Sequence, residues 1–249
     1  MSMGTIRPVA RALPCYPKSK DRHDMPALKI IIGTKTYSSW SLRGWLAVAH
    51  SGLVFEEVLL PLDTPEFRER IPALSPSRTV PALHHGDTVV WDSLAIIDYC
   101  ARLAPEKFWW PQELQAYGFA RSIAAEMHSS YMGLRSHAPM NLRGSWSGLE
   151  LSDAVRRDVE KVDARWTEAR TRFGADGEFL FGDFGAADMM FAPVVSRLLT
   201  YDIEVSETAK HYMEAVRQHP LVDAWYKDAA GETQVVEVDE LPAGITRLG

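Results

Sequence analysis

Two hydrophobic periods alternate in the first half of the chain. The segment "LKIIIG", residues 28–33, is a short, mainly apolar run, which is typical of a buried strand. Residues 39–51 instead place Leu42, Trp45 and Leu46 at helical spacing and stop before Gly52, a residue that commonly ends helices. From residue 28 onward the sequence therefore predicts a strand followed by a helix.

The same two patterns recur up to residue 105. "LVFEEVLL" predicts a second strand, and "TPEFRERI" predicts a helix with Thr64 as its N-cap and Pro65 at its first position. "TVPALHHGDTVVWD" predicts two short strands joined by a turn at residues 85–87, and "DSLAIIDYCARL" predicts a third helix. The order is strand, helix, strand, helix, strand, strand, helix, which is an α/β arrangement.

Strand patterns stop after a proline-containing boundary near residues 104–112. A long helix is predicted from Leu114 to Arg135, and another from Ser152 to Phe173. Residues 185–200 are apolar almost all round, which is typical of a helix in the middle of a bundle. Two more helices are predicted near 207–218 and 221–230, followed by an irregular tail. We therefore predict an α/β domain over residues 27–105 and an all-helical domain over residues 112–249.

Residues 1–26 differ from the rest of the chain, with five basic residues against two acidic ones and no clean periodicity. We predict a basic, flexible N-terminal extension there. An organelle-targeting peptide is an alternative, and so is an upstream start codon with Met25 as the usual beginning.

Composition limits the possible partners. The net charge of −6 argues against nucleic acid, and the sequence has no apolar run long enough to span a membrane. Cys15 and Cys100 sit in dissimilar settings, so we expect no disulfide framework and a reducing compartment, the cytoplasm. His84 and His85 are adjacent, but the sequence places no third ligand beside them, so no metal site is expected.

Three short segments place polar groups where strands give way to helices or turns. In "SSWS", residues 38–41, a hydroxyl can cap the helix or hold an anion or a sulfur at its amino end. In "WDSLAI", Asp92 and Ser93 can cap the next helix or bind an anion there. In "TVPAL", Pro81 is compatible with an ordinary trans proline at the start of an edge strand.

Together these segments resemble the soluble glutathione transferases, over roughly residues 27–232. "SSWS" is similar to the serine-type motif of the zeta class, which includes maleylacetoacetate isomerase, with Trp40 in the place of a cysteine. The resemblance implies a thioredoxin-like βαβαββα domain followed by an all-helical domain. It also implies that Ser38, with Ser39 as a second donor, stabilises the thiolate of glutathione as co-substrate.

The other two matches imply how glutathione is held. Val80-Pro81 resembles the residue before a cis-proline, whose backbone pairs with the cysteinyl part of glutathione. Asp92 and Ser93 resemble the pair that binds the γ-glutamyl end. "FGAADMMFAP" is similar to the family's capping box, with Asp188 reaching back to a backbone N–H and Gly185 where serine or threonine is usual.

The second substrate is expected between the Tyr37–Trp40 loop and the helix that begins near Leu114. Tyr37, Trp40, Met127, His128 and Tyr131 are its candidates, although Met127 is equally compatible with core filling. The stretch that follows carries further polar side chains that could receive a carboxylate, namely Arg135, His137 and Arg143.

We therefore predict a glutathione transferase that directs the thiolate at a small electrophile, by conjugation or by a zeta-like isomerisation. The alternative is a glutathione-binding module of the same fold with a regulatory role and little turnover. A homodimer and a role in detoxification are implied by the resemblance alone.

Overall fold

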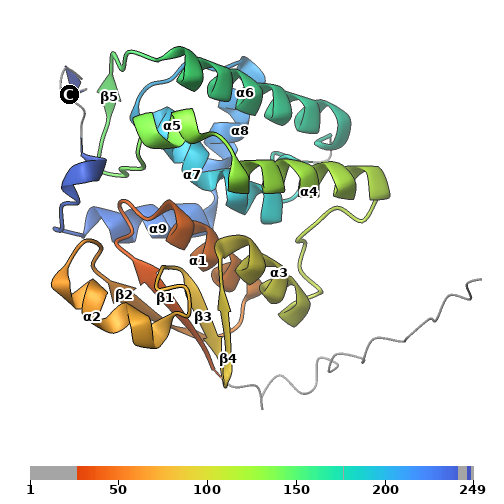
Figure 1. Cartoon of the computed structure of the whole chain (residues 1–249). Helices are drawn as coiled ribbons and strands as arrows, with labels where there is room; N and C mark the ends of the chain where they lie inside the picture. The colour runs from red at the N-terminus through yellow and green to blue at the C-terminus, as the bar shows by residue number, and fades with distance from the viewer. Residues whose placement is uncertain (1–26, 176, 241–245, 248–249) are drawn as a thin grey trace, which may run out of the picture.

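The computed structural model describes residues 27–175, 177–240 and 246–247 (Figure 1). The predicted N-terminal extension, residues 1–26, lies outside the described residues. The first half contains every predicted element in the predicted order: β1 (Leu28–Gly33), α1 (Ser39–Ser51), β2 (Phe55–Leu60), α2 (Pro65–Leu74), β3 (Ala82–His85), β4 (Thr88–Trp91) and α3 (Ser93–Leu103).

A four-stranded sheet of order β2-β1-β3-β4 organises this half. Strand β1 runs parallel to β2 and antiparallel to β3, and β4 is antiparallel to β3. Because side chains of a strand point alternately to its two faces, Ile30 and Ile32 enter the main core while Ile31 joins a smaller core under α2. Burial on both faces explains why the sequence of β1 is mainly apolar rather than alternating.

The helical half packs on the sheet face that α1 and α3 cover, and α2 covers the other face (Figure 1). Helix α7 lies at its centre, and Leu199 is its one exposed residue. The elements of this half are α4 (Leu114–Ser129), α5 (Met132–His137), β5 (Trp146–Ser147), α6 (Asp153–Phe173), α7 (Ala186–Thr200), α8 (Glu207–Gln218), α9 (Pro220–Ala230), η2 (Glu237–Asp239) and β6 (Thr246–Arg247).

The single helix predicted from Leu114 to Arg135 is wrong, because the chain breaks between α4 and α5. Tyr131 adopts a left-handed backbone with φ 59°, which ends α4, and its hydroxyl donates to Glu126. The Leu134 N–H donates to Asp158 of α6 at 3.0 Å, so a side chain from another helix satisfies the new amino end. The apolar periodicity continues through the break, and the sequence pattern therefore misses it.

The expectation of no strands after residue 112 is also wrong. Strands β5 and β6 form a two-residue antiparallel pair, which brings residues 246–247 back beside residues 146–147. Each strand is too short to produce a period-2 pattern.

The predicted capping box at the start of α7 is confirmed. Asp188 Oδ2 accepts from the Gly185 N–H at 2.9 Å, and Oδ1 accepts from the Leu180 N–H at 3.2 Å. A Cβ on Gly185 would lie 2.8 Å from the Trp109 carbonyl oxygen, so a serine or threonine there would clash. Burial raises the pKa of Asp188 to about 6, although its hydrogen bonds favour the charged form.

Candidate active site

Ser38 lies at the amino end of α1, in the loop that follows β1. A tight turn, in which the Ser38 N–H donates to the Thr34 carbonyl at 2.9 Å, brings the chain from the strand to the helix. Ser38 Oγ accepts from the Ser41 N–H at 3.3 Å and donates to Ser41 Oγ at 2.7 Å. Ser41 Oγ in turn accepts from the Gly33 N–H at 2.9 Å. Ser38 is therefore the N-cap of α1, and Ser39 is the first helical residue.

The Val80–Pro81 peptide bond is cis, as the resemblance implied. Pro81 packs directly against α1: a Cβ on Gly44 would lie 2.8 Å from its Cγ. Gly44 thus permits the close approach between the cis-proline loop and the helix that carries Ser38.

The Asp92 carboxylate has hydrogen-bond partners, whereas the Ser93 hydroxyl has none among the described residues. Asp92 caps α3, with Oδ1 accepting from the Leu94 N–H at 2.9 Å, and its Oδ2 lies 3.2 Å from His128 Nε2. The Ser93 hydroxyl is buried and has no hydrogen-bond partner among the described residues. The amino end of α3 therefore presents an unused hydroxyl together with helix N–H groups.

Two adjoining cavities collect most of the predicted site residues. The first, of about 480 Å³, is lined by Val80, Pro81, Asp92 and Ser93 among others. The second, of about 340 Å³, is lined by Tyr37, Ser38 and Ser39 among others. Trp40, Thr79 and Val80 line both cavities. The three polar segments of the sequence thus converge on one continuous site.

The predicted second-substrate residues do not all lie there. Tyr37 and Trp40 line the second cavity, whereas His128 lines the first, where it contacts the Trp40 ring edge-on at 5.4 Å. Met127 lies outside both cavities with no exposed surface, so its core-filling alternative is correct. Tyr131 is likewise buried outside both cavities, because the break after α4 turns its hydroxyl toward Glu126.

The second cavity has a basic wall that sequence reasoning largely missed. Arg197 of α7 donates to Ser39 Oγ at 3.4 Å and to the Ala138 carbonyl at 2.5 Å. Arg135 also lines the cavity, whereas Arg43 does not. The Cζ atoms of Arg43 and Arg135 lie 4.5 and 4.6 Å from the centre of the Trp40 ring. Only Arg135 was a candidate from the sequence. Arg43 follows "SSWSL" at helical spacing, but nothing local indicated that Arg197 would reach the same point.

Burial and mutual repulsion lower the pKa values of these arginines. Burial lowers the pKa of Arg43 to about 9, with Arg197 and Arg135 adding to the effect and Asp92 opposing it. Burial lowers the pKa of Arg197 to about 10, with Arg135 adding to the effect. Burial also lowers the pKa of Arg135. Arg43 and Arg197 therefore remain cationic at neutral pH.

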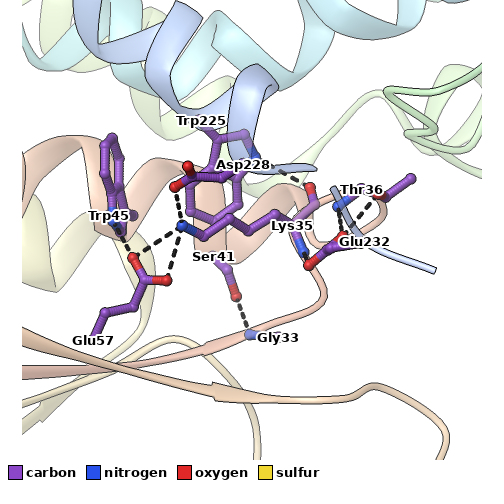
Figure 2. A network of polar contacts seen from close by, with 9 residues as sticks. All are labelled: Gly33, Lys35, Thr36, Ser41, Trp45, Glu57, Trp225, Asp228 and Glu232. Atoms are coloured by element: carbon purple, nitrogen blue, oxygen red, sulfur yellow. Dashed lines mark hydrogen bonds and ion pairs between the residues drawn. The ribbon is translucent and has the colours of Figure 1, made fainter. Parts of the chain in front are cut away.

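A second network ties the β1–α1 loop to the segment that follows α9 (Figure 2). The Glu232 carboxylate accepts from the Lys35 N–H at 2.7 Å, from the Thr36 N–H at 2.8 Å and from Thr36 Oγ1 at 2.8 Å. Lys35 Nζ lies 2.6 Å from Asp228 and 2.8 Å from Glu57. The loop that ends in Ser38 is therefore held by residues almost 200 positions away in the chain.

The same C-terminal segment also covers Tyr37. The Tyr37 hydroxyl donates to Glu240 and accepts from Arg143 at 2.7 Å. Burial and the hydrogen bond to Glu240 raise the pKa of Tyr37. The Tyr37 hydroxyl already donates its proton to a carboxylate, so Tyr37 lines the second cavity without offering a hydrogen-bond donor to it.

The two adjacent histidines contact protein groups rather than each other. His84 Nε2 lies 2.7 Å from the Leu74 carbonyl, and His85 Nδ1 lies 2.8 Å from the Tyr99 hydroxyl. In the described part of the chain, no group of three or more His, Cys, Asp or Glu side chains is arranged to hold a metal ion. None of the helices there is long and apolar enough to cross a membrane.

Comparison with known proteins identifies similar sequences and folds. Residues 37–103 match the family described as glutathione S-transferase, N-terminal domain. Glutathione S-transferase 1 of Dianthus caryophyllus is 30% identical over 176 residues, covering 68% of this chain and 76% of that protein. Glutathione S-transferase L1 of Arabidopsis thaliana is 23% identical over 200 residues, covering 77% and 76%.

Solved structures resemble the chain over most of its length. A glutathione transferase homologue from Burkholderia gl BGR1, with bound glutathione, superposes with a TM-score of 0.64 at 22% identity, covering 83% of this chain and all of that one. The Tau class enzyme from mango, Mangifera indica, superposes with a TM-score of 0.60 at 17% identity, covering 82% and 96%. At these identities the likeness demonstrates a shared fold.

Proposed function

Because this chain belongs to the glutathione S-transferase family, we propose that it ionises the thiol of bound glutathione at the amino end of α1 and directs the thiolate at a small electrophile. The observation that carries this proposal is the convergence of Ser38, Ser39 and the cis Val80–Pro81 loop on one pair of adjoining cavities.

Glutathione would lie across both cavities. The free Ser93 hydroxyl and the N–H groups of α3 suit the γ-glutamyl carboxylate, since helix amino ends bind anions. Asp92 Oδ2, which faces the first cavity beside His128, suits the α-ammonium group. The backbone of Val80, which borders both cavities, suits the cysteinyl residue and leads the sulfur toward Ser38 and Ser39.

The local groups are strong enough to ionise a thiol at neutral pH. A free thiol has a pKa of about 8.5, and lowering it by about two units takes roughly 2.7 kcal/mol. One hydrogen bond to a charged acceptor contributes about 1.5–3 kcal/mol. A helix amino end contributes about 0.3–1 kcal/mol. Ser38 would donate this hydrogen bond by turning its proton from Ser41 toward the sulfur, with Ser39 as the second donor.

Conjugation and zeta-like isomerisation begin with the same attack of the thiolate. In conjugation the new S–C bond is kept. Either a leaving group departs with the electrons of the bond that breaks, or a proton is added to the substrate. In isomerisation glutathione adds to the substrate and leaves again. The zeta assignment, the homodimer and the role in detoxification stay predictions.

Ultraviolet difference titration of the protein–glutathione complex tests the proposal directly. We expect the bound thiol to ionise about two pH units below the free thiol. A bound thiol that ionises at the pH of the free one would contradict the enzymatic mechanism. If glutathione is retained but no electrophile in a chemically varied screen is turned over, the alternative of a regulatory binding module is favoured.

Glu232 is expected to position the thiolate donor. Glu232→Gln leaves one oxygen to accept three hydrogen bonds and points an N–H₂ group at backbone N–H donors. We expect kcat to fall about three- to tenfold and the pKa of the bound thiol to rise, because the loop that carries Ser38 loses its fixed geometry. Stopped-flow kinetics and thiol titration measure both effects.

The matched control is Glu237→Gln, which changes an exposed glutamate of the same segment. It should leave both quantities unchanged. A normal thiol pKa in a stably folded Glu232→Gln protein would mean that this carboxylate does not position Ser38.

A further inference from the structure

Three guanidinium groups lie around Trp40 and Ser39, and none has a carboxylate partner in the described part of the chain. Arg43 and Arg135 each lie within 5 Å of the ring centre, and Arg197 reaches the neighbouring Ser39. No ion pair within 4 Å joins any of these arginines to an acidic side chain in the described part of the chain. Buried cations are normally paired, so this cluster requires an explanation.

Hydrogen bonds to backbone carbonyls account for only some of the N–H groups of these arginines. Arg197 donates to the backbone carbonyls of Arg135 and Ala138, and Arg43 Nε donates to the Met190 carbonyl at 3.0 Å. Arg43 Nη1, however, is buried with no hydrogen-bond partner among the described residues. Carbonyl dipoles also leave the charges themselves uncompensated in a site of low dielectric constant.

The acidic groups nearest the cluster do not neutralise it. Asp239 lines the second cavity and acts on Arg197 from beyond ion-pair distance. Asp92 acts on Arg43 in the same way, and its carboxylate is already used by α3 and His128. One glutathione thiolate would supply a single negative charge against three positive ones.

The open side of the cluster is the second cavity. Arg135 and Arg197 both line it, together with the two serines proposed to meet the sulfur. Its volume, about 340 Å³, is within the range of small-molecule pockets. Guanidinium groups bind carboxylates through paired charge-assisted hydrogen bonds, and Arg197 already lies 3.4 Å from Ser39 Oγ. A carboxylate a few bonds from the electrophilic carbon would therefore reach them.

We propose that the second cavity takes an electrophile that carries a carboxylate, bound by Arg135 and Arg197 and attracted by the charge of Arg43. This inference rests on the proposed function, because the second cavity receives an electrophile only if bound glutathione places its sulfur at Ser38 and Ser39. It names the chemical class of the second substrate, which the family does not specify.

Binding of two product analogues tests the inference without any turnover. S-carboxymethylglutathione and S-carbamoylmethylglutathione are nearly isosteric and share the whole glutathione part, so their affinities differ through the charge of the S-substituent. We expect calorimetry to give at least about tenfold tighter binding of the carboxymethyl analogue. Glutathione itself is titrated alongside them.

Variants of Arg135 test whether the preference for the carboxymethyl analogue comes from the arginines that line the second cavity. Arg135→Gln should reduce the ratio of the two affinities to about two or less, and Arg135→Lys should keep most of it because the charge remains. The matched control is Arg121→Gln in α4, before the break that separates α4 from α5, because Arg121 pairs with Asp98 and lines neither cavity. It should keep the wild-type ratio.

The outcomes separate the two proposals. Equal affinities of the wild-type protein for the two analogues, or an unchanged ratio in Arg135→Gln, overturn the carboxylate inference while glutathione binding stands. If neither glutathione nor either analogue binds, the proposed function is wrong, and this inference is wrong with it.

Discussion

Replacing Ser38 with alanine should lower turnover at least about tenfold, a loss of over about 1.4 kcal/mol of transition-state stabilisation. The reason is that the proposed thiolate loses its main hydrogen-bond donor at the amino end of α1. The pKa of the bound thiol should rise in the same variant. Steady-state kinetics with saturating glutathione and thiol titration measure the two effects.

Ser38 also caps α1, so the variant will lose stability as well as the donor. Removing an N-cap hydroxyl costs about 0.5–2 kcal/mol. Ser38→Asp separates the two roles, because aspartate caps well but its carboxylate only accepts hydrogen bonds. We expect Ser38→Asp to fold about as stably as the wild type and to turn over even more slowly than Ser38→Ala.

Ser39→Ala is the matched control for the choice of donor. Ser39 Oγ accepts from Arg197, and the structure gives its own proton no acceptor among the described residues, so it is the second candidate. Equal small losses in Ser38→Ala and Ser39→Ala would mean that neither hydroxyl is the main donor. A larger loss in Ser39→Ala would transfer the proposed role to Ser39.

Asp188→Ala should cause the largest loss of stability, about 2–5 kcal/mol in the free energy of unfolding. Its carboxylate accepts from the N–H groups of Gly185 and Leu180, both buried, and alanine leaves both donors unpaired. Urea denaturation at neutral pH measures the loss. The matched control is Asp183→Ala, an exposed aspartate in the same loop, which should change stability by less than about 0.5 kcal/mol.

The pH dependence of this loss has a defined sign. Burial raises the pKa of Asp188 to about 6, so folding favours the protonated form, and the stability that this carboxyl contributes decreases as the pH rises from about 4 to 6. The gap between the wild type and Asp188→Ala should therefore be larger at pH 4 than at pH 7. A gap that widens with rising pH would contradict the burial argument.

Local sequence signals predicted every helix and strand up to residue 103 and most of the helices after it. Thr64 and Asp188 each indicated a helix start through a short-range hydrogen bond between a side chain and a backbone N–H. Such contacts span only three or four residues, so they are readable without knowing the fold. The apolar runs of β1 and α7 likewise predicted two-sided and all-round burial.

Contacts between distant residues could not be predicted in this way. Arg197 reaches Ser39 across 158 positions, and nothing in the residues around either one indicates the other. The break at Tyr131 depends on Asp158 of α6, which satisfies the amino end of α5. The sequence therefore indicated the hydroxyls and turns of the candidate site but not its basic wall.

The hydrogen bonds between Glu232 and the β1–α1 loop affect the order in which the protein folds during synthesis on the ribosome. Glu232 is synthesised 197 positions after Lys35, whose N–H it accepts. A nascent chain that has completed the sheet still lacks the acceptor that fixes the loop ahead of Ser38. The growing polypeptide thus gains its proposed chemical competence only after α9 and the other helices beside the loop have been made.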